Sequence, residues 1–123
     1  MSWMWYLDRS LEKLRTIYPD TTVDRLIRLR QQRLRTIRIG ATTGFLTEEE
    51  GGCYAIEAPC HDQIELERTI FHEFAHWIDA MLHETLDHGE EWRKIVTALG
   101  YPEEVVREDE LNGRRQEGTH ETS

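Results

Sequence analysis

Apolar residues in the first part of the chain recur three or four positions apart, at Met4, Leu7, Leu11, Leu14 and Tyr18. This period predicts a helix from Trp3 to Tyr18 with Ser2 at its N-cap, which Pro19 ends. A second helical piece, beginning near Thr21, keeps the same period at Val23, Leu26, Ile27 and Arg30.

From about Leu34 the pattern changes to β-branched and aromatic residues that are typical of strands. Three short strands are predicted, at 35–39, 44–46 and 53–57, and the last two are separated by the acidic and glycine-rich turn 48–52. Because the strands are joined so tightly, we expect a small antiparallel meander.

A long helix is predicted next, with Asp62 at its N-cap and Glu65 three residues later. A shorter helix ends at Gly100, and its buried stripe is Trp92, Ile95, Val96 and Leu99. Residues 107–123 are polar apart from Leu111 and are predicted to form a disordered tail. The fold class expected from these elements is α+β, a small sheet packed against helices.

Composition narrows the class of protein. The 123 residues allow one domain, and the 38% hydrophobic content exceeds that of a disordered acidic chain. No run of 18 apolar residues predicts a membrane span, and the first residues lack the pattern of a signal peptide. We therefore expect an intracellular, cytoplasmic protein in which Cys53 and Cys60 are free thiols.

Charge is unevenly distributed, although the net charge is −9. Residues 1–40 carry nine Lys and Arg against four Asp and Glu, whereas residues 41–123 carry six against twenty. The basic excess is concentrated between 25 and 38, at Arg25, Arg28, Arg30, Arg33, Arg35 and Arg38. This patch, with Arg30, Arg33 and Arg35 at its centre, predicts weak non-specific contact with DNA phosphates. A solvated face, or pairing with the acidic part of the same chain, is the alternative.

The predicted long helix contains His72, Glu73 and His76 in the pattern HExxH. Two histidines four positions apart project from one face of a helix, so both imidazoles can reach one tetrahedral zinc ion. Glu73 lies beside this pair, where its carboxylate can accept a proton from metal-activated water. Zinc is therefore the expected cofactor.

A third ligand must come from elsewhere in the chain. His83 lies on the same face but about 10 Å further along a continuous helix. His88 is better placed, because it follows a turn that ends the helix and lets the chain fold back. Glu90, Glu91 or a later glutamate is a further alternative, in which the third ligand is a carboxylate.

The segment HEFAH at 72–76, followed by HGEEW at 88–92, resembles the SprT-like (Spartan-type) zinc metallopeptidase domain. The resemblance covers about residues 33–100, within a domain of 1–106 whose residues 1–32 are helical. It implies a zincin-like fold, zinc held by His72, His76 and His88, and Glu73 as general base. Its protein substrates would include proteins associated with DNA. No cysteine follows Gly100, so the chain resembles a minimal version without the C-terminal zinc ribbon.

Other residues near the motif have predicted roles. Asp79 lies on the ligand face, where it could orient a histidine. Tyr54, Arg93 and Tyr101 are candidates to polarise a scissile carbonyl. The functions that follow are a zinc endopeptidase acting on proteins or peptides, a related or repressor-cleaving HExxH enzyme with a glutamate ligand, or a non-catalytic zinc module that binds nucleic acid or a partner.

Overall fold

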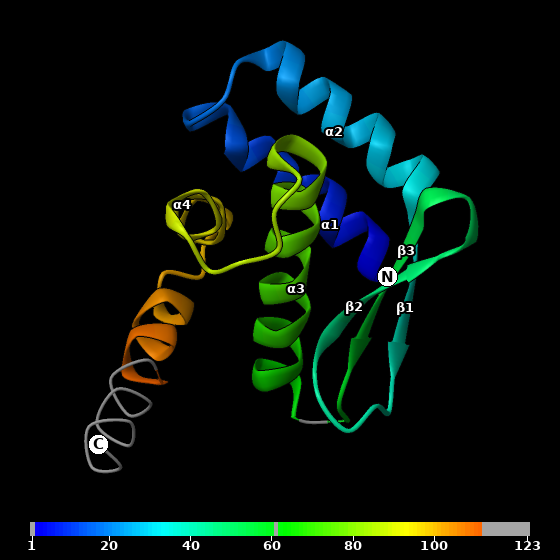
Figure 1. Cartoon of the computed structure of the whole chain (residues 1–123), viewed down its shortest axis with the longest axis vertical. Coiled ribbons are helices and arrows are strands. Elements are labelled where there is room, and N and C mark those ends of the chain that lie inside the picture. Colours follow the sequence, from blue (N-terminus) through cyan, green and yellow to red (C-terminus); the bar gives the residue numbers. More distant parts are fainter. Residues whose placement is uncertain (1, 61, 112–123) are drawn as a thin grey trace, which may run out of the picture.

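The computed structural model describes residues 2–60 and 62–111. The chain forms, in order, α1 (Trp3–Leu11), the 3-10 helix η1 (Glu12–Thr16), α2 (Asp20–Arg33), β1 (Leu34–Ile39), β2 (Phe45–Glu49), the short 3-10 turn η2 (Glu50–Gly52), β3 (Cys53–Ala58), α3 (Gln63–His83) and α4 (Glu90–Leu99). Figure 1 labels the α-helices and the strands. Residues 103–111 are also helical. The protein is therefore α+β, as predicted.

The N-terminal helix is shorter than its apolar period predicts. After Leu11 the backbone tightens into η1, and the backbone N–H groups of Ile17 and Tyr18 both donate to Leu14 O before α2 begins. Leu7, Leu11 and Leu14 are nevertheless fully buried, in the same core as the residues of α3 and α4. The first 32 residues thus belong to the scaffold that supports the rest of the chain.

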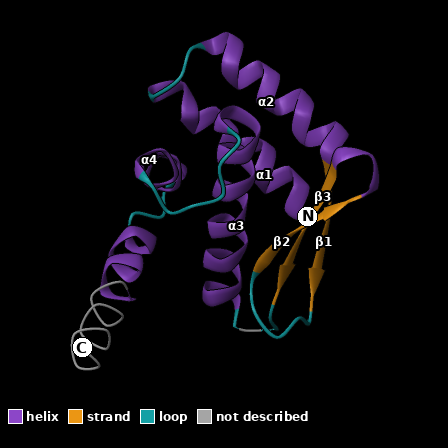
Figure 2. Ribbon diagram, viewed as in Figure 1, coloured by secondary structure: helices purple, strands orange, loops and turns teal. Residues whose placement is uncertain are grey.

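The sheet is mixed, so the predicted antiparallel meander is wrong. Its strand order is β1-β3-β2, with β1 parallel to β3 and β2 antiparallel to β3. Gly51 and Gly52 have positive φ, which permits the tight hairpin between β2 and β3. The connection after β1 carries the chain to the far edge of the sheet, and the hairpin then returns β3 to the centre beside β1. Figure 2 shows the three strands side by side.

Helix α3 is the central element of the fold. Asp62 caps it by accepting a hydrogen bond from the Glu65 amide at 3.0 Å, as the sequence predicts. The helix lies between the sheet and α4 (Figure 1), and it ends at Glu84, which adopts a left-handed conformation with φ 57°. That ending turns the chain back toward α3.

Helix α4 and the helix after it complete the described part. The buried stripe of α4 is the one predicted, and Gly100 ends the helix with φ 108°. The first part of the predicted disordered tail is helical: residues 107–111 continue the helix that follows α4, and Glu108 is buried. Residues 112–123 of the predicted tail lie outside the described residues. Among the described residues, no helix is long and apolar enough to cross a lipid bilayer.

Candidate metal centre

Two histidines of α3 form the base of the candidate metal centre. His72 and His76 are one helical turn apart, and their ring centroids are separated by 5.1 Å. Their position in the middle of a 21-residue helix holds the backbone of both residues rigidly. His76 is buried, whereas His72 reaches partly into solvent.

The third histidine is delivered by the loop after α3. The left-handed ending at Glu84 folds the chain back, and His88 Nε2 lies 3.1 Å from His72 Nε2 and 2.9 Å from His76 Nε2. Within the described residues, these three side chains are the group able to hold a metal ion together. The structure therefore brings together the three residues predicted as ligands.

The nitrogen atoms of the three histidines are close enough together to hold one metal ion. Three nitrogens, each about 2.0–2.1 Å from one tetrahedral ion, would be about 3.3–3.4 Å apart, close to the separations in this site. Burial, together with the neighbouring His72 and His88, lowers the pKa of His76 to about 3. Its imidazole is therefore neutral at pH 7 and has a lone pair for a metal. Nε2 of His76 is the atom that could coordinate, because it faces His88 Nε2 at 2.9 Å, whereas its buried Nδ1 has no hydrogen-bond partner among the described residues.

Trp92 of α4 forms a wall against all three imidazoles. Its ring centroid lies 4.8 Å from that of His72, 5.3 Å from that of His76 and 4.6 Å from that of His88. The indole N–H also donates to His72 O at 3.4 Å. An aromatic ring that is fully buried between the ligands limits their rotamers and excludes water from one side of the site.

Two glutamates of the last helix hold the outer nitrogens of the ligands. Glu104 Oε1 lies 3.0 Å from His72 Nδ1, and Glu108 Oε1 lies 3.2 Å from His88 Nδ1. Burial raises the pKa of Glu104, but the hydrogen bond to His72 and the charge of Arg107 lower it overall. An ionised carboxylate only accepts, so His72 Nδ1 carries the proton and Nε2 presents its lone pair.

Sequence reasoning missed both glutamates. Glu104 follows the helix predicted to end at Gly100, where no element was predicted, and Glu108 lies inside the predicted tail. The available signal was their spacing: after Pro102, which suits the start of a helix, Glu104 and Glu108 are four positions apart and share a helical face.

Glu73 lies beside the histidines at a small cleft. The cleft has a volume of about 170 Å³, and its lining includes His72, Glu73, Gly44 and Arg107. Burial raises the pKa of Glu73, Glu104 adds to this effect, and the neighbouring His72 opposes it. Glu73 Oε2 is 3.9 Å from His72 Nε2, so the carboxylate is adjacent to the ligand nitrogens without belonging to their group.

The loop before β2 approaches α3 closely at this cleft. A Cβ atom on Gly44 would lie 2.4 Å from Thr69 Cγ2 and 3.7 Å from Glu73 Oε2. A larger residue at this position requires the Thr69 side chain, the loop or the helix to move. Gly44 therefore fixes one wall of the cleft, a role that its place at the start of a predicted strand did not reveal.

The alternative ligands lie elsewhere. His83 Nδ1 is 2.8 Å from Asp79 Oδ1, and Thr85 donates to the other oxygen of this fully buried carboxylate, so Asp79 orients His83 and not one of the three converging histidines. Glu91 accepts from Tyr18 at 3.1 Å and lies 3.6 Å from His83, and Glu90 is exposed.

The residues suggested for carbonyl polarisation are not in the cleft lining. Tyr54 lines a groove beside α2, and Tyr101 donates to Glu67 on the opposite face of α3. Arg93 donates to His88 O at 3.2 Å and pairs with Asp109, so it supports the ligand loop. Arg107 is the cation that lines the cleft.

The predicted basic patch is divided by the fold. Arg30 is buried and paired with Asp8 through contacts of 2.6 and 2.8 Å, while Arg38 pairs with Glu49 and Glu57. Arg33 and Arg35 stay exposed, and Arg33 lines the same groove as Arg25.

Both cysteines are free, and Cys60 is exposed.

Comparisons of the chain with models of protein families, with curated proteins and with solved structures find no match.

Proposed function

We propose that the protein is a zinc-dependent metalloendopeptidase of SprT-like type that hydrolyses peptide bonds. The observation that carries the proposal is the convergence of three imidazole nitrogens beside the buried carboxylate of Glu73. His72, His76 and His88 would hold the zinc ion, which supplies Lewis acidity and makes hydroxide available near neutral pH. Zinc fits better than magnesium or calcium because the donors are all imidazoles.

Glu73 acts as the general base in this proposal. Its carboxylate lies next to the ligand nitrogens and faces the cleft, so it can take the proton of the attacking water and return it to the leaving amine. Burial raises the pKa of this carboxyl toward the working pH, which favours a group that must both accept and release a proton. Arg107 lines the same cleft and pairs with Glu104 at 3.3 Å, and in this proposal its guanidinium stabilises negative charge that develops on the scissile carbonyl.

Replacement of the base tests this function. Glu73→Gln should retain zinc, measured by elemental analysis after dialysis, and should lower the rate of casein hydrolysis by about 10²–10⁴-fold. Glu90→Gln is the matched control because Glu90 is an exposed acidic residue that follows the ligand loop. If Glu73→Gln cleaves casein at the wild-type rate, Glu73 is not the base. If the zinc-loaded wild type cleaves neither casein nor unfolded proteins while binding zinc tightly, the site is structural.

A contact with nucleic acid would direct this activity to proteins bound on DNA. Arg25 and Arg33, two helical turns apart on α2, both line a groove of about 430 Å³, and Arg35 is exposed nearby. This surface should bind phosphates without base preference, with a Kd of about 10⁻⁴–10⁻⁶ M that rises steeply with salt. Fluorescence anisotropy with labelled oligonucleotides measures it. Binding that Arg33→Gln with Arg35→Gln leaves unchanged would contradict the assignment.

A further inference from the structure

A second cavity lies on the face of α3 opposite the metal centre. Its volume is about 630 Å³, within the range of small-molecule sites. It lies between α1, the start of α3 and the turn after α4. Nothing in the proposed peptidase mechanism uses it.

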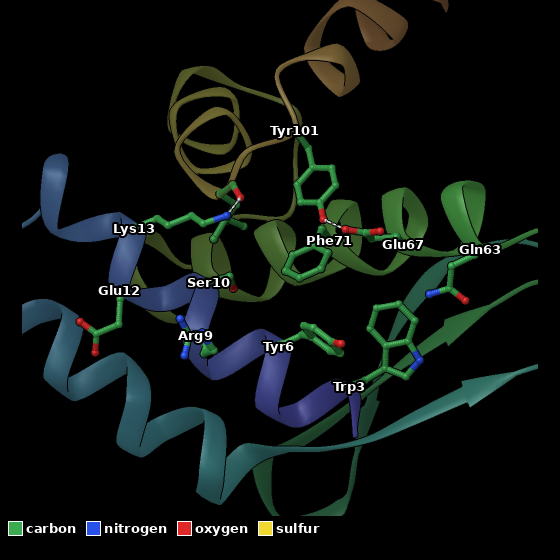
Figure 3. A pocket seen from close by; sticks show the side chains of 11 residues that line it. Trp3, Tyr6, Arg9, Ser10, Glu12, Lys13, Gln63, Glu67, Phe71 and Tyr101 are labelled. Atoms are coloured by element: carbon green, nitrogen blue, oxygen red, sulfur yellow. Dashed lines mark hydrogen bonds between the residues drawn. The ribbon is translucent and has the colours of Figure 1, made fainter. Parts of the chain in front are cut away.

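Aromatic rings form two walls of this cavity. Phe71 and Tyr101 are stacked with centroids 4.7 Å apart, and Trp3 and Tyr6 of α1 lie across from them (Figure 3). Tyr6 is 44% exposed, although it packs against two tryptophans. Rings on facing walls suit a flat aromatic ligand that can stack between them.

The two ends of the cavity differ in chemistry. Lys13 and Arg9 lie at one end, and among the described residues neither has a carboxylate partner: Lys13 donates to Leu99 O at 3.2 Å, and Arg9 lies over the Trp5 ring. Gln63 lies at the other end, with Glu67 between it and Tyr101 (Figure 3). Glu12 also lines the cavity near these cations, and its carboxylate is paired with Arg15 at 2.6 Å. The end at Lys13 and Arg9 therefore still attracts an anion, whereas the other end offers carboxylate and amide oxygens to an N–H donor.

Glu67 remains available for a ligand although it already has one partner. The Tyr101 hydroxyl donates to Oε1 of Glu67, and burial together with this hydrogen bond raises the pKa of Tyr101, so the hydroxyl keeps its proton. A carboxylate has about four acceptor positions, and this contact uses one of them. Glutamate and glutamine oxygens accept from the exocyclic amines of cytosine and adenine.

We propose that this cavity binds a nucleotide whose base carries an exocyclic amine, with adenosine monophosphate as the representative ligand. The base stacks between the aromatic walls, the amine donates to Glu67 or Gln63, and the phosphate lies at Lys13 and Arg9. Cationic side chains suit phosphate, and base stacking on aromatic side chains adds affinity. The site is independent of the proposed peptidase function.

Isothermal titration with AMP tests the proposal. Titrations are run on the zinc-loaded protein and again with EDTA, because phosphate could also reach a bound metal. AMP should bind in both, and more tightly than UMP, which has a carbonyl in place of the amine, and than adenosine, which lacks the phosphate. An oligonucleotide of deoxyadenosine, titrated in parallel, distinguishes a free nucleotide from a unit of a single strand.

Variants locate the binding. Tyr6→Ala should weaken AMP at least about fivefold by removing one stacking ring. Lys13→Gln should weaken AMP but leave adenosine unchanged, and Lys94→Gln, at an exposed lysine of α4, is the matched control. Glu67→Gln should reduce the preference for AMP over UMP. Absence of AMP binding at millimolar concentration, equal affinity for UMP, or binding that Tyr6→Ala and Lys13→Gln both leave intact would overturn the proposal.

Discussion

Neutralising Glu104 or Glu108 should weaken metal binding without removing any ligand. Both carboxylates are at least nine-tenths buried, and each faces the Nδ1 atom of a different histidine, at 3.0 and 3.2 Å. Such partners orient the imidazole and raise its basicity, and their loss typically costs about 10–100-fold in metal affinity. Glu→Gln keeps an acceptor oxygen but loses the charge. We therefore expect each variant to bind zinc about tenfold more weakly, which corresponds to about 1.4 kcal/mol of binding free energy. Glu104→Ala, which removes the acceptor as well, should approach 100-fold.

Competition for zinc against a chromophoric chelator at pH 7 measures this loss. Glu110→Gln is the matched control, because Glu110 lies on the same helix with an exposed side chain. The thermal midpoint of each metal-free variant, measured in EDTA, separates a weakened site from an unfolded helix. The reasoning is refuted if folded Glu104→Gln and Glu108→Gln bind zinc as tightly as Glu110→Gln does. Equal losses for all three would indicate a general effect of charge.

Three further outcomes are expected. Gly44→Ala should lower the thermal midpoint, measured by circular dichroism, and should slow hydrolysis, because its Cβ would meet the Thr69 methyl group at 2.4 Å. Arg30→Gln should cost about 1–3 kcal/mol in urea unfolding by leaving a paired carboxylate without its partner, whereas exposed Arg33→Gln should change stability little. The metal-free protein should lose stability as the pH falls from about 6.5 toward 3, because in this window the unfolded chain binds a proton at His76 that the folded chain does not. His76→Gln should flatten that pH dependence, and an unchanged slope would contradict the assignment.

The convergence of the three histidines could be predicted because the information for it is local. His72 and His76 share a helical face through their spacing, and His88 follows a turn only a few residues after the helix end. The α+β class and the strand segments were likewise readable from short-range patterns. The pairing of β1 with β3 was not, since it joins residues that the β2 hairpin separates in the chain. The short connections between the predicted strands favoured pairing of strands that follow one another in the sequence.

Sequence patterns also failed to predict which charged residues are buried. Arg30 and Glu108 are two such residues, and the reasons differ. Arg30 shares the helical period of Val23 and Leu26, so its inward position could be inferred, and only its partner Asp8 required the structure. Glu108 had no apolar period around it, and its burial depends on docking of the last helix against the histidines. From composition alone, a polar and charged segment of this kind is predicted to be exposed to solvent, because its tertiary partner is not visible in the sequence.

The turn after α4 connects the aromatic cavity with the candidate metal centre. Tyr101 lines the aromatic cavity, Glu104 contacts His72 three residues later, and the Glu104 amide donates to Tyr101 O at 3.1 Å. A ligand that moves Tyr101 therefore also moves the carboxylate that orients a metal ligand. Any such coupling is reciprocal: a nucleotide that changes the zinc affinity by some factor has its own affinity changed by zinc through the same factor. If both proposed sites bind their ligands, this turn is the element through which the two occupancies would be coupled.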